Sequence, residues 1–99
     1  MQLDAAGWKV ERQYQYAPPR KFAADLFVAG VVLVEVQGGI YSRQAHGSIS
    51  GVLKDNERLN EAAIAGLFMM RVTPDQVDSG EALMLVERFL AHDPEAVEA

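Results

Sequence analysis

The hydrophobic and polar positions in the first third of the chain repeat with the period of β-strands. Residues 8–16 (WKVERQYQY) alternate aromatic or apolar side chains with polar ones, a period near two that is typical of a half-buried strand. Pro18 and Pro19 then end this strand, because proline cannot continue a hydrogen-bonded ladder. The apolar runs at 21–28 and 31–39 predict two further strands.

The run at 31–39 (VVLVEVQGG) contains two polar residues in an otherwise buried strand. Glu35 and Gln37 are two positions apart, so both side chains lie on one face of the strand. A carboxylate there is costly to desolvate unless it is paired or binds a metal. Gly38 and Gly39 end the strand, and we expect them to allow close approach of a ligand or another backbone.

A short turn between these two strands predicts an antiparallel hairpin. A two-residue loop would place Asp25 and Glu35 on opposite faces. A three-residue loop, with Gly30 in the left-handed region, pairs Val28 with Val32 and puts Asp25 directly opposite Glu35. We predict the three-residue loop, which brings two carboxylates together.

The second half of the chain has the period of helices, interrupted by one strand. A Gly- and Ser-rich loop at 40–52 precedes a helix at 53–65, and Gly66 is suited to cap its C-terminus. One stripe of this helix comprises Val52, Asn56, Leu59 and Ala63, and the opposite surface carries Lys54, Asp55, Arg58 and Glu61. Residues 67–73 predict a buried strand that is parallel to 31–39, since a helical crossover connects the two.

A last helix is expected to begin at Asp78, with Glu81 completing its N-terminal cap, and to end near Ala91. Its apolar positions should cover the sheet: Ala82, Leu83, Val86, Phe89 and Leu90. The pattern therefore predicts one α/β domain over 1–99, with a mixed four-stranded sheet (an antiparallel hairpin plus a parallel crossover) and two helices.

Composition and charge limit the cellular location and the binding partners that we expect. The chain has no cysteine, which excludes disulfides and thiolate zinc sites and makes a reducing cytoplasm the default location. The N-terminal residues lack the pattern of a secretion signal, and no segment predicts a membrane span. The net charge is −5, but residues 1–60 carry seven basic and six acidic groups, so the acidity lies in the last third. A nucleic-acid partner is therefore compatible with the charge of the first two thirds.

Two carboxylates converging with a third polar group suit Mg²⁺, which prefers hard oxygen ligands. Such an ion can activate water and bind a scissile phosphate, so the pattern favours phosphodiester hydrolysis. Four blocks, in order, also resemble the PD-(D/E)XK endonucleases, in particular small phage-type and very-short-patch-repair-like members. These blocks are RKFAADLFVAGVVLVEVQGG, RQAHGSISG, KDNERLNEAAIAG and RVTPDQVDSGEAL.

The resemblance implies a restriction-endonuclease-like core that cleaves DNA with Mg²⁺ or Mn²⁺ in repair or recombination, in a bacterial host cell if the gene is phage-encoded. It makes Asp25 and Glu35 metal ligands and places Gln37 where the family usually has lysine. Because the family sometimes moves this lysine to the following helix, Lys54 and Arg58 are candidates for its role. Loop residue His46 is a candidate for orienting water or contacting phosphate.

The resemblance also implies an opening helix with a further acidic residue, for which the residues before Trp8 leave little room. Glu11, on the first strand, is the nearby candidate for a third metal ligand, and a second subunit is a candidate source of the helix. A homodimer would also suit symmetric cleavage of a branched substrate such as a Holliday junction.

Each of these residues also has a purely structural interpretation. Asp25 and Glu35 can be satisfied by backbone donors or by an arginine such as Arg71, and Lys54 and Arg58 are typical of a solvated helix face. The neutral Gln37 favours an alternative function, in which the chain is a catalytically inactive nuclease-fold module that binds DNA or a protein partner.

Overall fold

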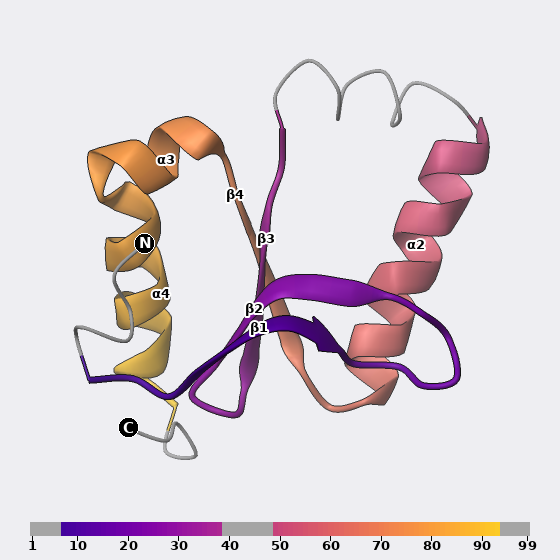
Figure 1. Cartoon of the computed structure of the whole chain (residues 1–99), viewed down its shortest axis with the longest axis horizontal. Coiled ribbons are helices and arrows are strands. Elements are labelled where there is room, and N and C mark those ends of the chain that lie inside the picture. The colour runs from indigo at the N-terminus through magenta and orange to yellow at the C-terminus, as the bar shows by residue number, and fades with distance from the viewer. Residues whose placement is uncertain (1–6, 39–48, 94–99) are drawn as a thin grey trace.

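The computed structural model describes residues 7–38 and 49–93, which form one mixed sheet with helices on both sides (Figure 1). The strand order is β1-β2-β3-β4. The strands are β1 (Val10–Gln15), β2 (Ala23–Val28), β3 (Val32–Val36) and β4 (Phe68–Val72). The helices are α2 (Ile49–Ile64), α3 (Pro74–Ser79) and α4 (Glu81–Leu90). The predicted α/β class and mixed four-stranded sheet are confirmed.

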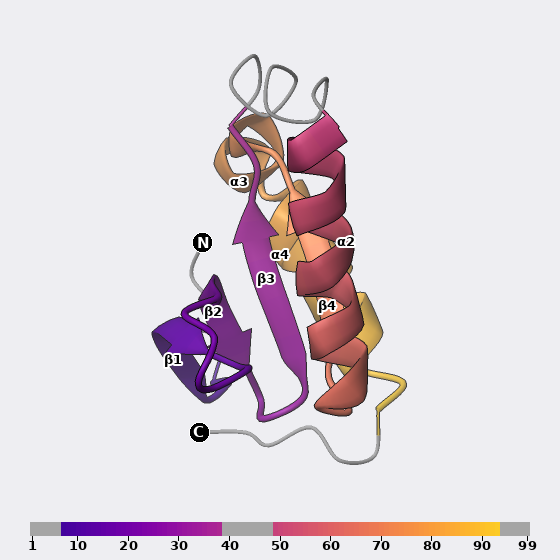
Figure 2. The same cartoon turned by 90° about the vertical axis from the view of Figure 1, so that its right-hand side faces the viewer.

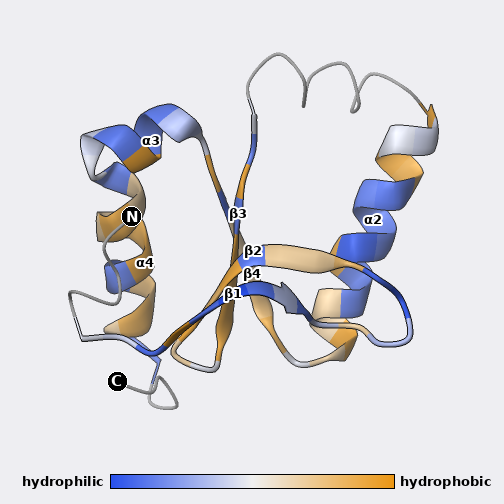
Figure 3. Cartoon of the chain, in the orientation of Figure 1, coloured by the Kyte–Doolittle hydropathy of each residue, from blue (hydrophilic) through white to orange (hydrophobic). Residues whose placement is uncertain are grey.

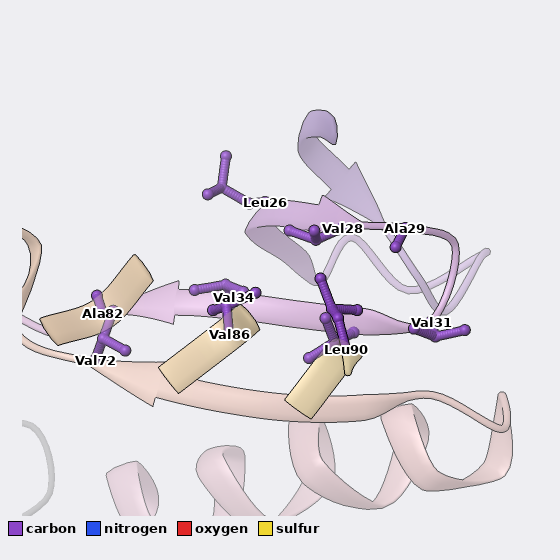
Figure 4. Close-up of a cluster of buried hydrophobic side chains, with 10 residues drawn as sticks. Leu26, Val28, Ala29, Val31, Val34, Val72, Ala82, Val86 and Leu90 are labelled. Atoms are coloured by element: carbon purple, nitrogen blue, oxygen red, sulfur yellow. The ribbon is translucent and has the colours of Figure 1, made fainter. Parts of the chain in front are cut away.

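The core is divided between the two faces of the sheet because side chains alternate along β3. Val32 and Val34 belong to a cluster with Val86 and Leu90 of α4 (Figure 4). Leu33 belongs to a second cluster on the face that α2 covers, where Ala62 is the buried residue of the helix. β3 is thus buried on both sides, as expected for a central strand.

The hairpin between β2 and β3 has the predicted three-residue loop. Val28 pairs with Val32, and the pairing continues through Leu26 and Val34, so that Asp25 stands opposite Glu35 in this register. Gly30 has a φ of 72°, in the left-handed region, as predicted. The register that the shared carboxylate site requires is therefore present.

The crossover from β3 to β4 is parallel, as predicted, with Val32 opposite Phe68 and Glu35 opposite Arg71. Figure 2 looks from the side of α2 and shows this helix in front of the sheet near β4. Among the described residues, no helix combines the length and the apolar character that crossing a membrane requires.

The helix α2 differs from its prediction in two respects. It begins at Ile49, within the segment predicted to be a loop. The predicted stripe does not pack on the sheet: Val52 is 45% exposed and Leu59 is 38% exposed. The more buried side instead comprises Gly51, Asp55, Arg58 and Ala62. Figure 3 shows the resulting hydrophilic middle of α2. Asp55 and Arg58 face inward because charged groups on the sheet bind them, as described below.

The predicted last helix is two helices. Thr73, not Asp78, caps the first: its Oγ1 accepts from the Gln76 N–H at 3.2 Å, and Gln76 Oε1 accepts from the Thr73 N–H at 3.0 Å. Asp78 lies inside α3, and Gly80, with a φ of 87°, separates α3 from α4. The predicted apolar face of α4 is confirmed, since all five of its positions are buried in, or packed against, the first cluster.

Two leucines allow a matched test of this packing. Leu33 is fully buried, whereas Leu53 is 60% exposed on α2. We expect Leu33→Ala to lower the free energy of unfolding by roughly 2–5 kcal/mol, because it leaves a cavity in the central strand. Leu53→Ala should change it by no more than about 0.5 kcal/mol. Urea denaturation measures both, and equal losses would contradict the burial of β3.

Candidate functional site

A pocket of about 380 Å³ opens beside the ends of β2 and β3, next to the first turns of α2. Five of the predicted site residues line it: Asp25, Glu35, Gln37, Lys54 and Arg58. The two acids lie on β2 and β3, Gln37 directly follows β3, and α2 contributes the two cations. The parallel crossover thus brings residues that are about 20–30 positions apart in the sequence to one place.

Asp25 lies at the edge of this pocket and is held by the neighbouring strand. Its Oδ2 accepts a hydrogen bond of 2.7 Å from the Val36 N–H of β3. Asp25 also borders a second pocket of about 400 Å³, together with Gln13 and Val77. Its carboxylate therefore stands at the end of the sheet, where ligands can approach from either face.

Glu35 is the buried charged residue of the described chain, with 9% of its surface exposed. Its two oxygens have different partners. The Arg58 Nη2 donates to Oε1, and Oε2 lies 3.6 Å from the Nε of Arg71 on β4. Two guanidinium groups therefore compensate the desolvation of this carboxylate, one from α2 and one from the adjacent strand.

Arg71 is in turn fixed by Asp55 of α2. Its Nη1 donates to Oδ2 at 2.8 Å and its Nη2 donates to Oδ1 at 2.5 Å, a bidentate arrangement. The hydrogen bond to Asp55 raises the pKa of Arg71 above its usual value, against the effect of burial. Its buried Nε has no hydrogen-bond partner in the described structure and faces only the Glu35 carboxylate.

Arg58 has weaker secondary contacts. Its Nη2 is 3.2 Å from the carbonyl oxygen of Ala23, and its guanidinium carbon lies 5.3 Å from the centre of the Phe22 ring. The Tyr16 hydroxyl donates to the main-chain carbonyl of Arg58 at 3.4 Å. Burial raises the pKa of Tyr16, so this phenol stays protonated at neutral pH. Tyr16 and Phe22 therefore both lie beside Arg58.

Gln37 and Lys54 complete the polar lining of the pocket. The Gln37 N–H donates to the Val72 carbonyl at 2.7 Å, which extends the β3–β4 pairing and fixes the backbone that carries the amide. Lys54 is exposed on α2. A Cβ at Gly38 would meet no atom within 4 Å, so this glycine borders open space rather than a closely packed neighbour.

Two predicted residues are not part of this arrangement. Glu11 is exposed on the edge strand β1, opposite Phe27, and does not line the pocket. His46 lies outside the described residues, as does Gly39. The described residues contain no group of three or more His, Cys, Asp or Glu side chains placed to hold a metal ion.

Sequence reasoning missed the role of Asp55 and underestimated Arg71. Arg71 appeared only as a structural alternative for the acids, and Asp55 only as part of a solvated surface. The available signal was the spacing of Asp55, Arg58 and Ala62, which puts all three on one helix face. Pairing Asp55 with the single charged residue of β4 would have identified this face.

The donor types in the pocket fit Mg²⁺, since carboxylate and amide oxygens come from Asp25, Glu35 and Gln37. The Asp25 carboxylate accepts from the Val36 N–H, whereas both oxygens of Glu35 face guanidinium groups. A metal at Glu35 would therefore have to replace Arg58 at Oε1.

Comparison of the chain with protein-family models, curated proteins and solved structures finds no match.

Proposed function

We propose that this chain is a metal-dependent endonuclease that hydrolyses phosphodiester bonds in DNA. One observation carries the proposal: the hairpin register, extended one residue beyond the Leu26–Val34 pair, aligns Asp25 with Glu35, and both carboxylates line a pocket that also contains Gln37 and two cations. The resemblance to PD-(D/E)XK endonucleases assigns the same pair of acids to metal binding.

The chain's own groups have distinct tasks in this proposal. Asp25 and Glu35 would hold Mg²⁺, which when bound supplies the Lewis acidity for activating water. The Gln37 amide, on a backbone fixed by Val72, orients the attacking water. Lys54 and Arg58 contact the phosphate and offset the charge that develops on its oxygens. Hydrolysis joins the water oxygen to phosphorus and breaks the P–O bond to a deoxyribose oxygen in line; the water loses a proton to solvent and the leaving oxygen takes one up.

Removing either acid should abolish cleavage. We expect Asp25→Ala and Glu35→Ala to lower the cleavage rate in Mg²⁺ by more than about a hundredfold, because charge stabilisation at the phosphate is lost. The matched control is Asp78→Ala, an exposed acid on α3 outside the pocket lining, which should keep the wild-type rate. Circular dichroism checks folding, and full activity in either acid variant would refute this site.

We also propose that the nuclease acts as a homodimer on branched DNA such as a four-way junction. The free edge of β4 supports a second copy as the occupant: among the described residues it pairs only with β3, and its strand carries the 57% exposed Phe68. The apolar stripe of α2, Val52 and Leu59, is exposed as well. A two-fold axis across β4 would supply each copy with both a strand and an apolar helix surface.

The dimer can be tested separately from catalysis. We expect a dimer by light scattering after size exclusion, and Phe68→Glu should convert it to a monomer by placing a charge at the shared edge. Met84→Glu is the control, since Met84 is 64% exposed on α4. A monomeric wild type at tens of micromolar would refute the dimer. Cleavage of linear, nicked, flapped and four-way DNA then tests the preference for branches.

A second candidate function is a nuclease-fold module that binds DNA or a protein without cleaving. The observation that favours it is the pairing of both Glu35 oxygens with arginines, together with the neutral Gln37. In that case Asp25 and Glu35 would be structural, and divalent cations would not bind the folded state.

Metal titration distinguishes the two functions. A ligand that binds only the folded state stabilises it, by about 2.7 kcal/mol at a hundred times its Kd. For a domain of this size this should raise the melting temperature by roughly 10–20 °C. We expect such a rise with Mn²⁺ for the wild type and none for Asp25→Ala. An unchanged melting temperature in the wild type would favour the inactive module.

A further inference from the structure

We infer that Arg58 is a displaceable internal cation, which holds Glu35 until a divalent cation takes its place at Oε1. This inference rests on the proposed metal-dependent function and concerns how that site is regulated. The two arginines that share Glu35 are held unequally.

Arg71 is fixed on both sides. Its Nη atoms make the bidentate pair with Asp55, its Nε faces Glu35 Oε2, and its side chain does not line the pocket. Moving Arg71 would leave two partly buried carboxylates without their partner. Arg71 therefore remains in place and keeps one oxygen of Glu35 oriented.

Arg58 is held less strongly and lies where a ligand can reach it. Apart from Glu35, its guanidinium contacts the Ala23 carbonyl at 3.2 Å and the Phe22 ring, and it lines the pocket. Its side chain is 26% exposed. Releasing Glu35 Oε1 would expose this oxygen on the side of the pocket that also contains Asp25.

The charges of the cluster make the two cations mutually exclusive. The pocket and its support contain three carboxylates (Asp25, Glu35, Asp55) and three cations (Lys54, Arg58, Arg71), so the group is neutral as it stands. A divalent ion beside an unmoved Arg58 would add repulsion between two cations that share Oε1 of a buried carboxylate. Metal entry is therefore coupled to the departure of Arg58.

The freed guanidinium would face the pocket, where a phosphate of DNA is a suitable partner for it. A phosphate would thus stabilise the displaced arginine and, through it, the bound metal. By linkage, DNA should tighten metal binding, and metal should tighten DNA binding to the same extent. The site would assemble fully only when both ligands are present.

The test measures Mn²⁺ binding by calorimetry in the absence of DNA. We expect Arg58→Met, which removes the charge and keeps the length, to bind Mn²⁺ at least about tenfold more tightly than the wild type. Arg58→Lys should stay near the wild type, because it keeps a competing charge. The matched control is Arg20→Met: Arg20 also lies over Phe22, at 4.5 Å, but it pairs with Glu57. This variant should leave Mn²⁺ affinity unchanged.

The melting temperature provides a second measurement in case the Arg58→Met protein folds poorly without metal. Its melting temperature should then rise more with Mn²⁺ than that of the wild type, and Arg58→Gln should behave likewise. Equal Mn²⁺ affinity in wild type and Arg58→Met, with loss of binding in Glu35→Ala, would overturn the displacement and leave the proposed nuclease intact. Absence of Mn²⁺ binding in every protein would overturn the metal site and the displacement together.

Discussion

The buried Glu35 side chain on β3 is the constraint on which the rest of the structure depends. A carboxylate that is 9% exposed must be compensated within the protein, since its desolvation is otherwise unfavourable. Arg58 and Arg71 provide this compensation from opposite sides, and Asp55 fixes Arg71. The four side chains connect β3, β4 and α2, so the position of the helix on the sheet follows from one buried charge.

This charge also explains why the apolar stripe of α2 faces outward. A helix that packed by hydrophobicity alone would turn Val52 and Leu59 toward the sheet, but that rotation would carry Arg58 away from Glu35. Separating a buried ion pair costs roughly 3–5 kcal/mol. Val52 and Leu59 are already more than half buried, so burying the rest of both would contribute only about 1–3 kcal/mol. The polar face therefore turns inward, and the stripe remains available for a partner.

The residues predict the sheet and the carboxylate register well because those features depend on local chemistry. The alternating pattern of the strands, the turn at Gly30 and the alternation around Glu35 can each be recognised from a few consecutive residues. The rotation of α2 was not predictable from its own periodicity, since it depends on Arg71, which lies at least seven residues beyond the helix. The separate helix α3 was not predicted for a different reason. The capping box of Thr73 and Gln76 starts a helix earlier than the start predicted at Asp78.

The buried charges are better explained by a functional role than by a contribution to the stability of the fold. Well-packed apolar residues of similar volume often stabilise a fold as much as a buried ion-pair network does. A domain of 99 residues has a modest core, so placing four charged side chains between its sheet and one of its helices is a substantial sacrifice of apolar burial. The network also borders the pocket and leaves one of its two arginines accessible from it. That asymmetry agrees with the proposed exchange of partners at Glu35.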